Sequence, residues 1–449
     1  MRHEPQKLTA GPLPRQILRF SIPLILSNML QVLFNLSDIA VVGRFAGAAA
    51  LGAVGSTSHL VYLFTSFLLG MGSGVNVLAA RYYGAENREA LIQTVHTSLM
   101  VCAAVGGIIL ALGQALCVPM LALLGTRPDL AAGAALYMRI YLLGAPALAV
   151  YNYGQAVFSA VGDTRRPLLY LTVSGILNVA LNLFFVLVCH MDVDGVALAS
   201  VLSQYLAAVL VLAALFRSRE DYGLRRDRMR YHPARASALL ALGLPAGAQN
   251  AIFAVANLFI QGGVNTFSST VVEGNAAAAN GDLLMFNVMD AFYIACASFV
   301  SQNFGAGRRD RVLKSYYLCL AYSFASAVIL GGLLIWARYP FLSLFTTSED
   351  VIAAGAQRMI IMCCSYWISS FMDCTSYASR GLGKSLVPVI ITIAGSCVFR
   401  VIWVYTVFAH YGTFSSLYLV YAFSWTITAA AQLWYFARCY RGQYPAGKS

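Results

Sequence analysis

The chain contains 449 residues, of which 59% are hydrophobic and only 11% are charged. Soluble domains carry roughly 25% charged residues, and so little polar surface could not cover several soluble domains. The same composition excludes a disordered chain, which combines low hydrophobicity with high charge. With a formal net charge of +12, the sequence predicts a basic polytopic membrane protein.

Apolar runs long enough to cross a bilayer, which takes ~20 residues, follow one another along the whole chain. The first run is too long for the apolar core of a cleavable signal peptide, so it is predicted to remain as a span. No separate soluble domain is apparent, and function is expected to lie in the spans and short loops. The twelve predicted spans are 17–42, 51–80, 91–118, 130–157, 167–190, 195–216, 238–264, 277–303, 313–337, 352–378, 387–409 and 414–437.

The positions of the basic residues predict the orientation of these spans. Most of the 30 Lys and Arg residues fall near the two ends of the chain and in the segments that follow even-numbered spans. Because cytoplasmic loops are enriched in Lys and Arg, both termini are predicted to be cytoplasmic, in a cell inner (plasma) membrane. The longest basic segment, RSREDYGLRRDRMRYHPAR at 217–235, is interpreted as a solvated linker between the halves, with contact to anionic lipid headgroups as the weaker alternative. The positive charge is therefore a topology signal, and no nucleic-acid partner is predicted.

The two halves of the chain repeat each other in one register. Pro23 corresponds to Pro245, and further along Pro167 corresponds to Pro388. Each half holds six predicted spans, so both halves enter the membrane in the same direction. Their pseudo-two-fold axis then lies along the membrane normal, as in transporters built from parallel repeats.

The predicted fold is therefore an all-α integral membrane protein, with twelve transmembrane helices in two six-helix lobes related by a parallel repeat. The predicted boundaries are 1–216 for the N-lobe, 217–237 for a cytoplasmic linker and 238–449 for the C-lobe. A polar space between two such lobes suits alternating access and favours a carrier over a channel or an enzyme.

Polar residues in the spans of the first half form the main candidate site. Gln31, Asn35 and Asp38 follow one another at i, i+4 and i+7, which places them on one helix face. A charged residue inside a span is costly and marks a functional site by default. Taken singly, the other polar residues are also typical of hydrogen bonds between helices, but with Asp38 they are interpreted as one polar chamber. They are Tyr137, Asn152, Gln155, Asn178, Asn182 and Ser200.

Three charged residues stand out in the spans of the second half. Asp290 and Arg400 both lie near the middle of their spans, and we expect them to pair because an unpaired buried charge is unfavourable. A structural ion pair and direct contact with substrate remain the two interpretations of Arg400. Asp373 lies nearer the end of its span, before Arg380, and is a weaker candidate.

Metal and catalytic motifs are not apparent in the sequence. The ten cysteines are scattered, mostly through apolar runs, and neither Cys nor His shows the spacing of a zinc site. No nucleophile–base set appears. No metal, no cofactor and no enzymatic activity are predicted.

Several stretches together resemble the multidrug and toxic compound extrusion (MATE) family, in particular its bacterial DinF-like branch. The matching stretches are LSDIAVVGRFAG (36–47), ARYYGAENRE (80–89), SAVGDTRRP (159–167), NVALNLFFV (178–186), SQNFGAGRRD (301–310) and SRGLGKSLVP (379–388). The resemblance implies an antiporter that alternates between outward-facing and inward-facing states. It implies export of amphipathic, often cationic drugs or metabolites, coupled to inward flow of H⁺ or Na⁺.

The resemblance also suggests roles for particular residues. The family's cation-responsive aspartate falls on Asp38, with Asn178 and Asn182 beside it in ion coupling. The family's polar partners in the first lobe fall on Gln31, Tyr137, Asn152, Gln155 and Ser200, with Asn35 on the same stripe. The family's usual motif has a second aspartate where this chain has Asn182, so the coupling ion and its stoichiometry stay open.

Two alternatives are retained. A lipid-linked oligosaccharide flippase of the same superfamily would need several cationic residues to hold a pyrophosphate, and only Arg400 lies deep in a span. An integral membrane enzyme would need a nucleophile or metal set near one membrane face. The expected partners are amphipathic small molecules and membrane lipids, and a monomer is predicted.

Overall fold

The computed structural model describes residues 7–444, and all regular secondary structure in that range is helical. The α-helices are α1 (Leu13–Val41), α2 (Gly47–Gly84), α3 (Arg88–Leu123), α4 (Pro128–Leu142), α5 (Ala145–Ala160), α6 (Arg165–Leu183), α7 (Val193–Arg217), α8 (Pro233–Val264), α9 (Ser269–Gly305), α10 (Arg309–Trp336), α11 (Arg338–Leu342), α12 (Glu349–Gly381), α13 (Leu386–Thr392), α14 (Phe399–Trp403), α15 (Ala409–Tyr411) and α16 (Phe414–Gln443). Short π-helical turns are η1 (Val42–Ala46), η2 (Phe184–Val188), η4 (Ile393–Val398) and η5 (Val404–Phe408), and a 3₁₀ turn is η3 (Arg226–Arg228).

The predicted spans correspond to observed helices throughout. Among the described residues, 11 helices are long and apolar enough to cross a membrane, and the bent pair α4 and α5 makes a twelfth span. The span from α13 to α15 is continuous but contains the π-helical turns η4 and η5. The all-α transmembrane fold predicted from hydropathy is therefore confirmed.

The break between α4 and α5 has a local cause in the sequence. The two helices meet at an angle of 45°, and the junction reads Leu143, Gly144, Ala145, Pro146. Proline lacks the amide hydrogen that the preceding turn needs, and its ring disfavours helical backbone before it. The corresponding span in the second half, α12, has Ser365 and Trp367 in the places of Gly144 and Pro146 and continues without a break.

The described chain forms two compact units. The first contains Lys7 and residues 26–251, and the second contains residues 8–25 and 252–444. Thus α1 and α8 each contribute one part to each unit. The lobe boundaries inferred from the sequence repeat, 1–216 and 238–449, divide the chain differently and stay a prediction.

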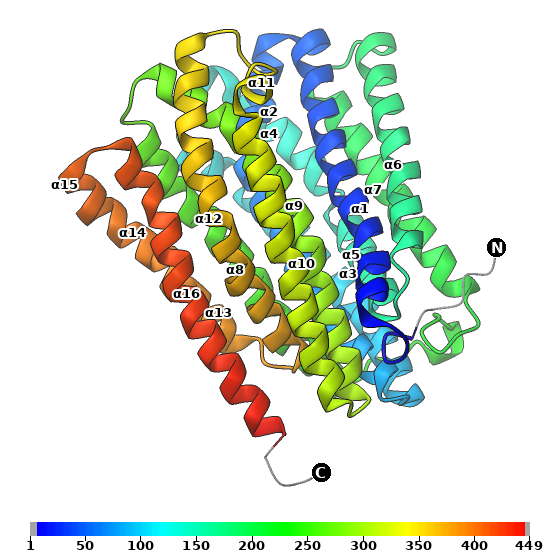
Figure 1. The fold of residues 1–449 in the computed structure, drawn as a ribbon. Helices are drawn as coiled ribbons and strands as arrows, with labels where there is room; N and C mark the ends of the chain where they lie inside the picture. Colours follow the sequence, from blue (N-terminus) through cyan, green and yellow to red (C-terminus); the bar gives the residue numbers. More distant parts are fainter. Residues whose placement is uncertain (1–6, 445–449) are drawn as a thin grey trace. The chain divides into compact units, whose positions relative to one another are not determined.

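Helix packing inside the two units follows one plan. In the first unit α5 packs on α2 and α3, and α7 packs on α4, α5 and α6. In the second unit α12 packs on α9 and α10, and α16 packs on α12 and on the span from α13 to α15. The long helices of each unit can be followed side by side in Figure 1. Equivalent spans therefore make equivalent contacts, as the repeat predicts.

Glycines let helices of the first unit approach closely. A Cβ atom added to Gly70 of α2 would fall on the backbone of Gly247 in α8. One added to Gly74 would come within 2.8 Å of the Gly243 nitrogen, and one on Gly72 within 3.3 Å of the Asn152 carbonyl oxygen. Small residues permit such contacts between membrane helices. The run Gly70–Gly74 is therefore a packing motif.

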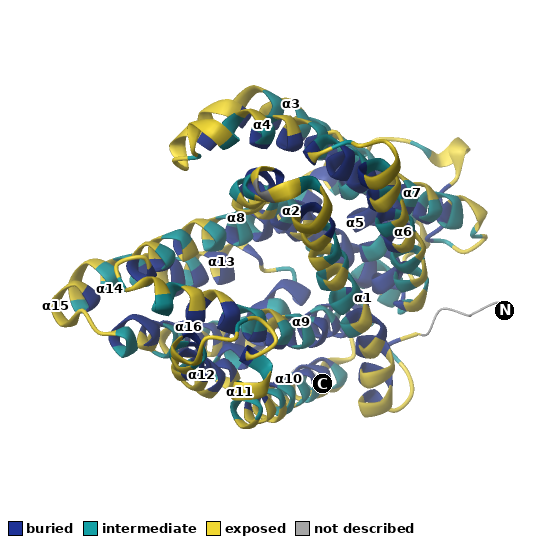
Figure 2. Ribbon diagram, turned by 90° about the horizontal axis from the view of Figure 1, so that it is seen from above, coloured by how far each residue is buried: buried dark blue, intermediate teal, exposed yellow. Residues whose placement is uncertain are grey.

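Large apolar side chains are exposed on many helices, and Figure 2 marks the exposed stretches of the ribbon in yellow. Ile176 of α6, Val209 of α7, Ile329 of α10 and Ile402 of α14 are each more than half exposed. A soluble protein avoids such broad apolar surface because water solvates it poorly. In a membrane protein the same surface contacts apolar lipid tails.

The basic linker between α7 and α8 is anchored at a few residues, while most of its arginines are exposed, as the interpretation as a solvated segment predicts. Asp221 accepts a 2.6 Å hydrogen bond from Arg88, and the Arg225 amide donates to His96 Nε2 at 2.9 Å. Tyr222 is buried with its ring edge-on to Phe158 at 6.3 Å. His96 in α3 thus holds the linker.

Candidate functional site

Asp38 lies in a hydrogen-bonded cluster built from α1, α6 and α7 of the first unit. Asn182 donates from Nδ2 to Asp38 Oδ1, and Ser200 Oγ donates to Asp38 Oδ2 at 3.4 Å. Asn178 Nδ2 donates to Ser200 Oγ at 3.5 Å, and Asn182 Nδ2 also lies 3.4 Å from Asn178 Oδ1. The structure therefore brings together Asp38, Asn178, Asn182 and Ser200, which we call the Asp38 cluster.

Helix periodicity explains why the amide side chains of Asn178 and Asn182 lie together. Asn178 and Asn182 are four residues apart on α6 and so lie on one face, and both are buried. Asp38 lies one turn before η1, and α6 continues directly into η2. π-Helical turns occur frequently at functional sites.

One acceptor in the Asp38 cluster is left open. Asn182 Oδ1 is buried and has no hydrogen-bond partner among the described residues. A buried unpaired acceptor beside a carboxylate is unfavourable by itself, and a bound cation or proton would satisfy it. The cluster thus offers several oxygen atoms and one acidic charge, which suits H⁺ or a hard cation.

Two tyrosines adjoin the Asp38 cluster. Tyr137 of α4 is buried, and its ring stacks on that of Tyr141 with centroids 5.9 Å apart. The charge of Asp38 interacts electrostatically with both tyrosines. Tyr141 was missed in the sequence, although its spacing of four from Tyr137 was a usable signal.

The other predicted chamber residues lie apart from this network. Gln31 and Asn35 are exposed on α1, Asn152 is buried in α5, and Gln155 is half-buried. Within residues 7–444, no side-chain hydrogen bond joins any of these four to Asp38. Their placement in the chamber stays a prediction.

Arg400 does not pair with Asp290 in the described structure, so the predicted ion pair was wrong. The guanidinium donates from Nε to Ser424 Oγ at 3.4 Å and from Nη1 to Asn257 Oδ1 at 3.3 Å. Its carbon lies 4.3 Å from the centre of the Tyr421 ring. Neutral and aromatic groups therefore surround this charge.

Asp290 and Asp373 belong instead to a cluster around Arg380. Tyr377 donates to Asp290 Oδ1 at 3.4 Å, and the buried Arg380 guanidinium lies 4.9 Å from the Tyr377 ring. Asp373 interacts electrostatically with Arg380, Asp290 and Arg400. Arg380, which the sequence assigns to the cytoplasmic end of its span, is thus part of the interior of the second unit.

The buried ion pair of the second unit was missed in the sequence. Arg358 of α12 donates from Nη2 to Asp282 of α9, and both side chains are largely buried. Arg358 also stacks over Tyr418, with its guanidinium carbon 5.2 Å from the ring centre. Two opposite charges inside predicted spans 8 and 10 were the available signal.

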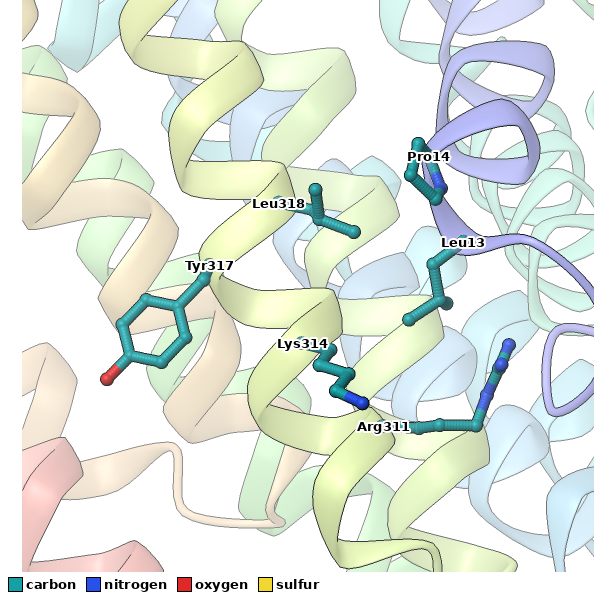
Figure 3. A pocket seen from close by; sticks show the side chains of 6 residues that line it. All are labelled: Leu13, Pro14, Arg311, Lys314, Tyr317 and Leu318. Atoms are coloured by element: carbon teal, nitrogen blue, oxygen red, sulfur yellow. The ribbon is translucent and has the colours of Figure 1, made fainter.

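A pocket of about 470 Å³ lies elsewhere in the second unit, between the start of α1 and α10. Figure 3 shows the six side chains that line it: Leu13, Pro14, Arg311, Lys314, Tyr317 and Leu318. None of the predicted site residues lines it. Within the described part of the chain, no group of three His, Cys, Asp or Glu residues could hold a metal ion.

Two units of equivalent helix packing, a lipid-compatible surface and buried polar clusters within the spans define a polytopic membrane transporter. Comparison with known protein families then shows to which family of transporters the chain belongs. A family model described as MatE matches residues 23–184 and again residues 245–406. The chain belongs to the MatE family, and the double match reproduces the repeat seen in the sequence. Membership confirms that the chain is a transporter and not an enzyme.

Individual relatives agree with this family. The chain is 30% identical to the probable multidrug resistance protein YoeA of Bacillus subtilis (strain 168), over 86% of this chain and 85% of YoeA. It is 26% identical to an FAD transporter of Shewanella oneidensis, over 80% of each. A MOP superfamily transporter from Pyrococcus furiosus shares the fold, with a TM-score of 0.91, 21% identity and 99% of both chains covered.

Proposed function

We propose that this chain is a cation-coupled antiporter, driven by H⁺ or Na⁺, that exports amphipathic, often cationic drugs or metabolites by alternating access. The observation that carries the proposal is the Asp38 cluster, a carboxylate inside a span whose hydrogen bonds come from neutral groups. The multidrug resistance name of the similar YoeA protein supports the same substrate class.

The proposed mechanism follows from what a cation does at Asp38. When it is ionised, Asp38 accepts hydrogen bonds from Asn182 and Ser200. A proton on the carboxyl, or Na⁺ between Asp38 and the open Asn182 oxygen, removes the charge and changes these hydrogen bonds. A ligand shifts a conformational equilibrium only by its difference in affinity for the two states. The proposal therefore requires the Asp38 cluster to bind the cation unequally in the two states.

The membrane setting belongs to this proposal. We place the chain in the inner (plasma) membrane with both termini cytoplasmic, because Lys and Arg gather in alternate segments. The proposed transporter is a monomer. Inward flow of the cation and outward flow of substrate would then pass through the same chain.

The test is efflux from proteoliposomes that contain the purified chain. Asp38→Asn keeps the shape of the side chain but removes its charge, and we expect gradient-driven efflux of a cationic dye to be abolished with normal expression. Asp129→Asn is the matched control, because Asp129 is an exposed acid that pairs with Arg127 at the surface. Efflux by Asp38→Asn at the wild-type rate would contradict the proposal.

A further inference from the structure

Arg400 is a buried cation without a carboxylate in contact. Its side chain lies in the second unit and is only 2% exposed. Both of its hydrogen-bond partners, Ser424 and Asn257, are neutral. Among residues 7–444, Arg400 makes no ion pair within 4.0 Å, and its Nη2 nitrogen has no hydrogen-bond partner. A buried charge usually requires a partner of opposite charge, so this one has unused binding capacity.

Aromatic rings enclose the guanidinium. Its carbon lies 4.3 Å from the centre of the Tyr421 ring, 5.5 Å from Phe253 and 5.8 Å from Trp425. The negative faces of these rings stabilise the cation, and they also offer flat apolar surface on which a planar compound can stack.

The site can be reached at Asn257. This side chain is exposed, although it accepts the hydrogen bond from Arg400 Nη1. Phe253, one turn earlier on α8, is half-buried, as is Tyr421 on α16. A ligand at the exposed face of α8 would therefore meet Asn257 first and Arg400 directly beneath it.

The Arg400 site and the Asp38 cluster are built from equivalent spans of the two halves but carry opposite charges. Asn257 corresponds to Asn35 in the register that matches Pro23 with Pro245. The Asp38 cluster is formed by spans 1, 5 and 6, and the Arg400 site by the equivalent spans 7, 11 and 12. Equivalent sets of spans thus hold an acid in one half, on span 1, and a base in the other half, on span 11.

We propose that Arg400 and Asn257 form an anion-binding subsite for planar aromatic compounds that carry a carboxylate or phosphate group. The guanidinium fork binds such groups with two hydrogen bonds, and the aromatic ring of the ligand would pack beside Phe253 and Tyr421. The proposal rests on the transport function proposed above and adds anionic aromatic compounds to its substrate class.

The competing explanation is a structural one, in which Arg400 only balances the charge of Asp373 at a distance. The two explanations differ in what loss of Arg400 changes. A counter-charge stabilises the fold for every substrate, whereas a subsite affects anionic compounds selectively.

Binding of two dyes with the same xanthene ring system separates these explanations. The full-length chain in neutral detergent is titrated against anionic 5-carboxyfluorescein and against cationic rhodamine 6G, with fluorescence anisotropy as the readout. For Arg400→Gln we expect binding of 5-carboxyfluorescein to weaken about tenfold or more, the effect of losing a hydrogen bond to a charged group. Binding of rhodamine 6G should change less than threefold.

Two further variants keep the test decisive if Arg400→Gln is unstable. Arg400→Lys retains the charge but loses the fork, and Asn257→Leu removes the exposed amide together with the hydrogen bond that it accepts from Arg400. Both should weaken 5-carboxyfluorescein binding and leave the thermal unfolding midpoint within a few degrees of wild type. Equal losses for both dyes, or no binding of 5-carboxyfluorescein to the wild-type chain, would overturn the proposal.

The source of the anion and the proposed function are separated by two additional measurements. If phosphatidylglycerol added to the detergent displaces 5-carboxyfluorescein from the wild-type chain at equimolar amounts, the subsite holds a lipid headgroup and the proposal is wrong. Gradient-driven efflux of the cationic dye rhodamine 6G from proteoliposomes tests the transport function of the wild-type chain, because binding of this dye is not expected to depend on Arg400. Loss of that efflux with intact, Arg400-dependent dye binding would contradict the transport function alone.

Discussion

Asn182 lies where the resemblance to the MATE family led us to expect a second carboxylate, and its amide contacts Asp38 directly. An amide can donate to the ionised aspartate, which a carboxylate cannot do. The Asp38 cluster therefore holds a single acidic charge, and the amide is matched to the ionised form of Asp38.

Introducing the second acid should alter ion coupling. In Asn182→Asp two carboxylates would share one buried site, where like charges disfavour ionisation of both. We expect the dependence of efflux on pH or on Na⁺ to change, measured in proteoliposomes at fixed substrate concentration. Asn182→Ala is the control that removes the amide without adding a charge. An unchanged pH and Na⁺ profile in Asn182→Asp would show that position 182 has no part in coupling.

Breaking the buried ion pair of Asp282 and Arg358 should destabilise the second unit. Removing one partner of a buried ion pair costs about 3–5 kcal/mol, because the other charge is left unpaired. We expect Asp282→Asn and Arg358→Gln each to lower the thermal unfolding midpoint, and the double variant to recover much of the loss.

The exposed pair of Arg127 and Asp129 is the matched control for this cycle. Both side chains are more than half exposed, and such surface pairs contribute only about 0–1 kcal/mol. Neutralising Asp129 should leave the midpoint nearly unchanged. Strictly additive losses at Asp282 and Arg358 would mean that these two residues do not interact.

The sequence predicted the members of the Asp38 cluster but paired Arg400 wrongly, for a simple reason. Span counting gives the depth of a residue, but it does not give the rotation of its helix. Asn178 and Asn182 could be placed on one face because they share a helix. Asp290 and Arg400 lie on different helices, and side-chain packing decided that Arg400 meets Asn257 and Tyr421 instead.

Close approach of α2 and α8 depends on glycine. A methyl group on Gly70 would overlap the backbone of Gly247, and backbone cannot move aside as a flexible side chain can. We expect Gly70→Ala to destabilise the chain by about 1–3 kcal/mol, the usual cost of overpacking, seen as a lower unfolding midpoint in detergent.

Gly107→Ala tests whether this effect comes from packing or from loss of glycine as such. No atom lies within 4 Å of a Cβ atom built on Gly107 in α3, and alanine is the better helix former by about 0.5–1 kcal/mol. Gly107→Ala should therefore be neutral or stabilising. A similar loss in both variants would contradict the packing explanation.

Element positions were predictable where one signal dominated. Hydropathy located every span, and the Gly144–Pro146 sequence accounts for the bend that α12 lacks. The basic composition of the linker predicted its exposed arginines, but not the points at which it is anchored. Its attachment depends on single contacts, such as the Arg225 amide with His96, which composition does not reveal.

At the scale of the whole molecule, the repeat preserves the arrangement of helices but not their polar residues. Equivalent spans pack alike in the two units, and one family model matches both halves. The polar sites nevertheless differ, with Asp38 in one and Arg400 in the other. Helix packing tolerates many apolar side chains of similar volume, whereas each charge depends on particular partners.

The proposed topology predicts which cysteines an impermeant thiol reagent can reach. Cys189 is exposed near the end of η2, on the side assigned to the exterior. A variant that keeps only Cys189 should be labelled from outside intact spheroplasts. In a cysteine-free background, Asp227→Cys in the exposed part of the linker should be labelled only after permeabilisation. The opposite labelling pattern would show that the chain has the reverse orientation in the membrane.

The division of α1 between the two compact units has a consequence for biosynthesis. Residues 8–25 leave the ribosome early, yet they belong with residues 252–444, which follow more than 200 residues later. At about 5–20 residues per second, this segment must wait tens of seconds for its partners, sheltered by lipid or by the insertion machinery. If the gene were divided within the linker, residues 8–25 would be made as part of the N-terminal fragment. The C-terminal fragment could then complete the second unit only by binding residues 8–25 of the N-terminal fragment.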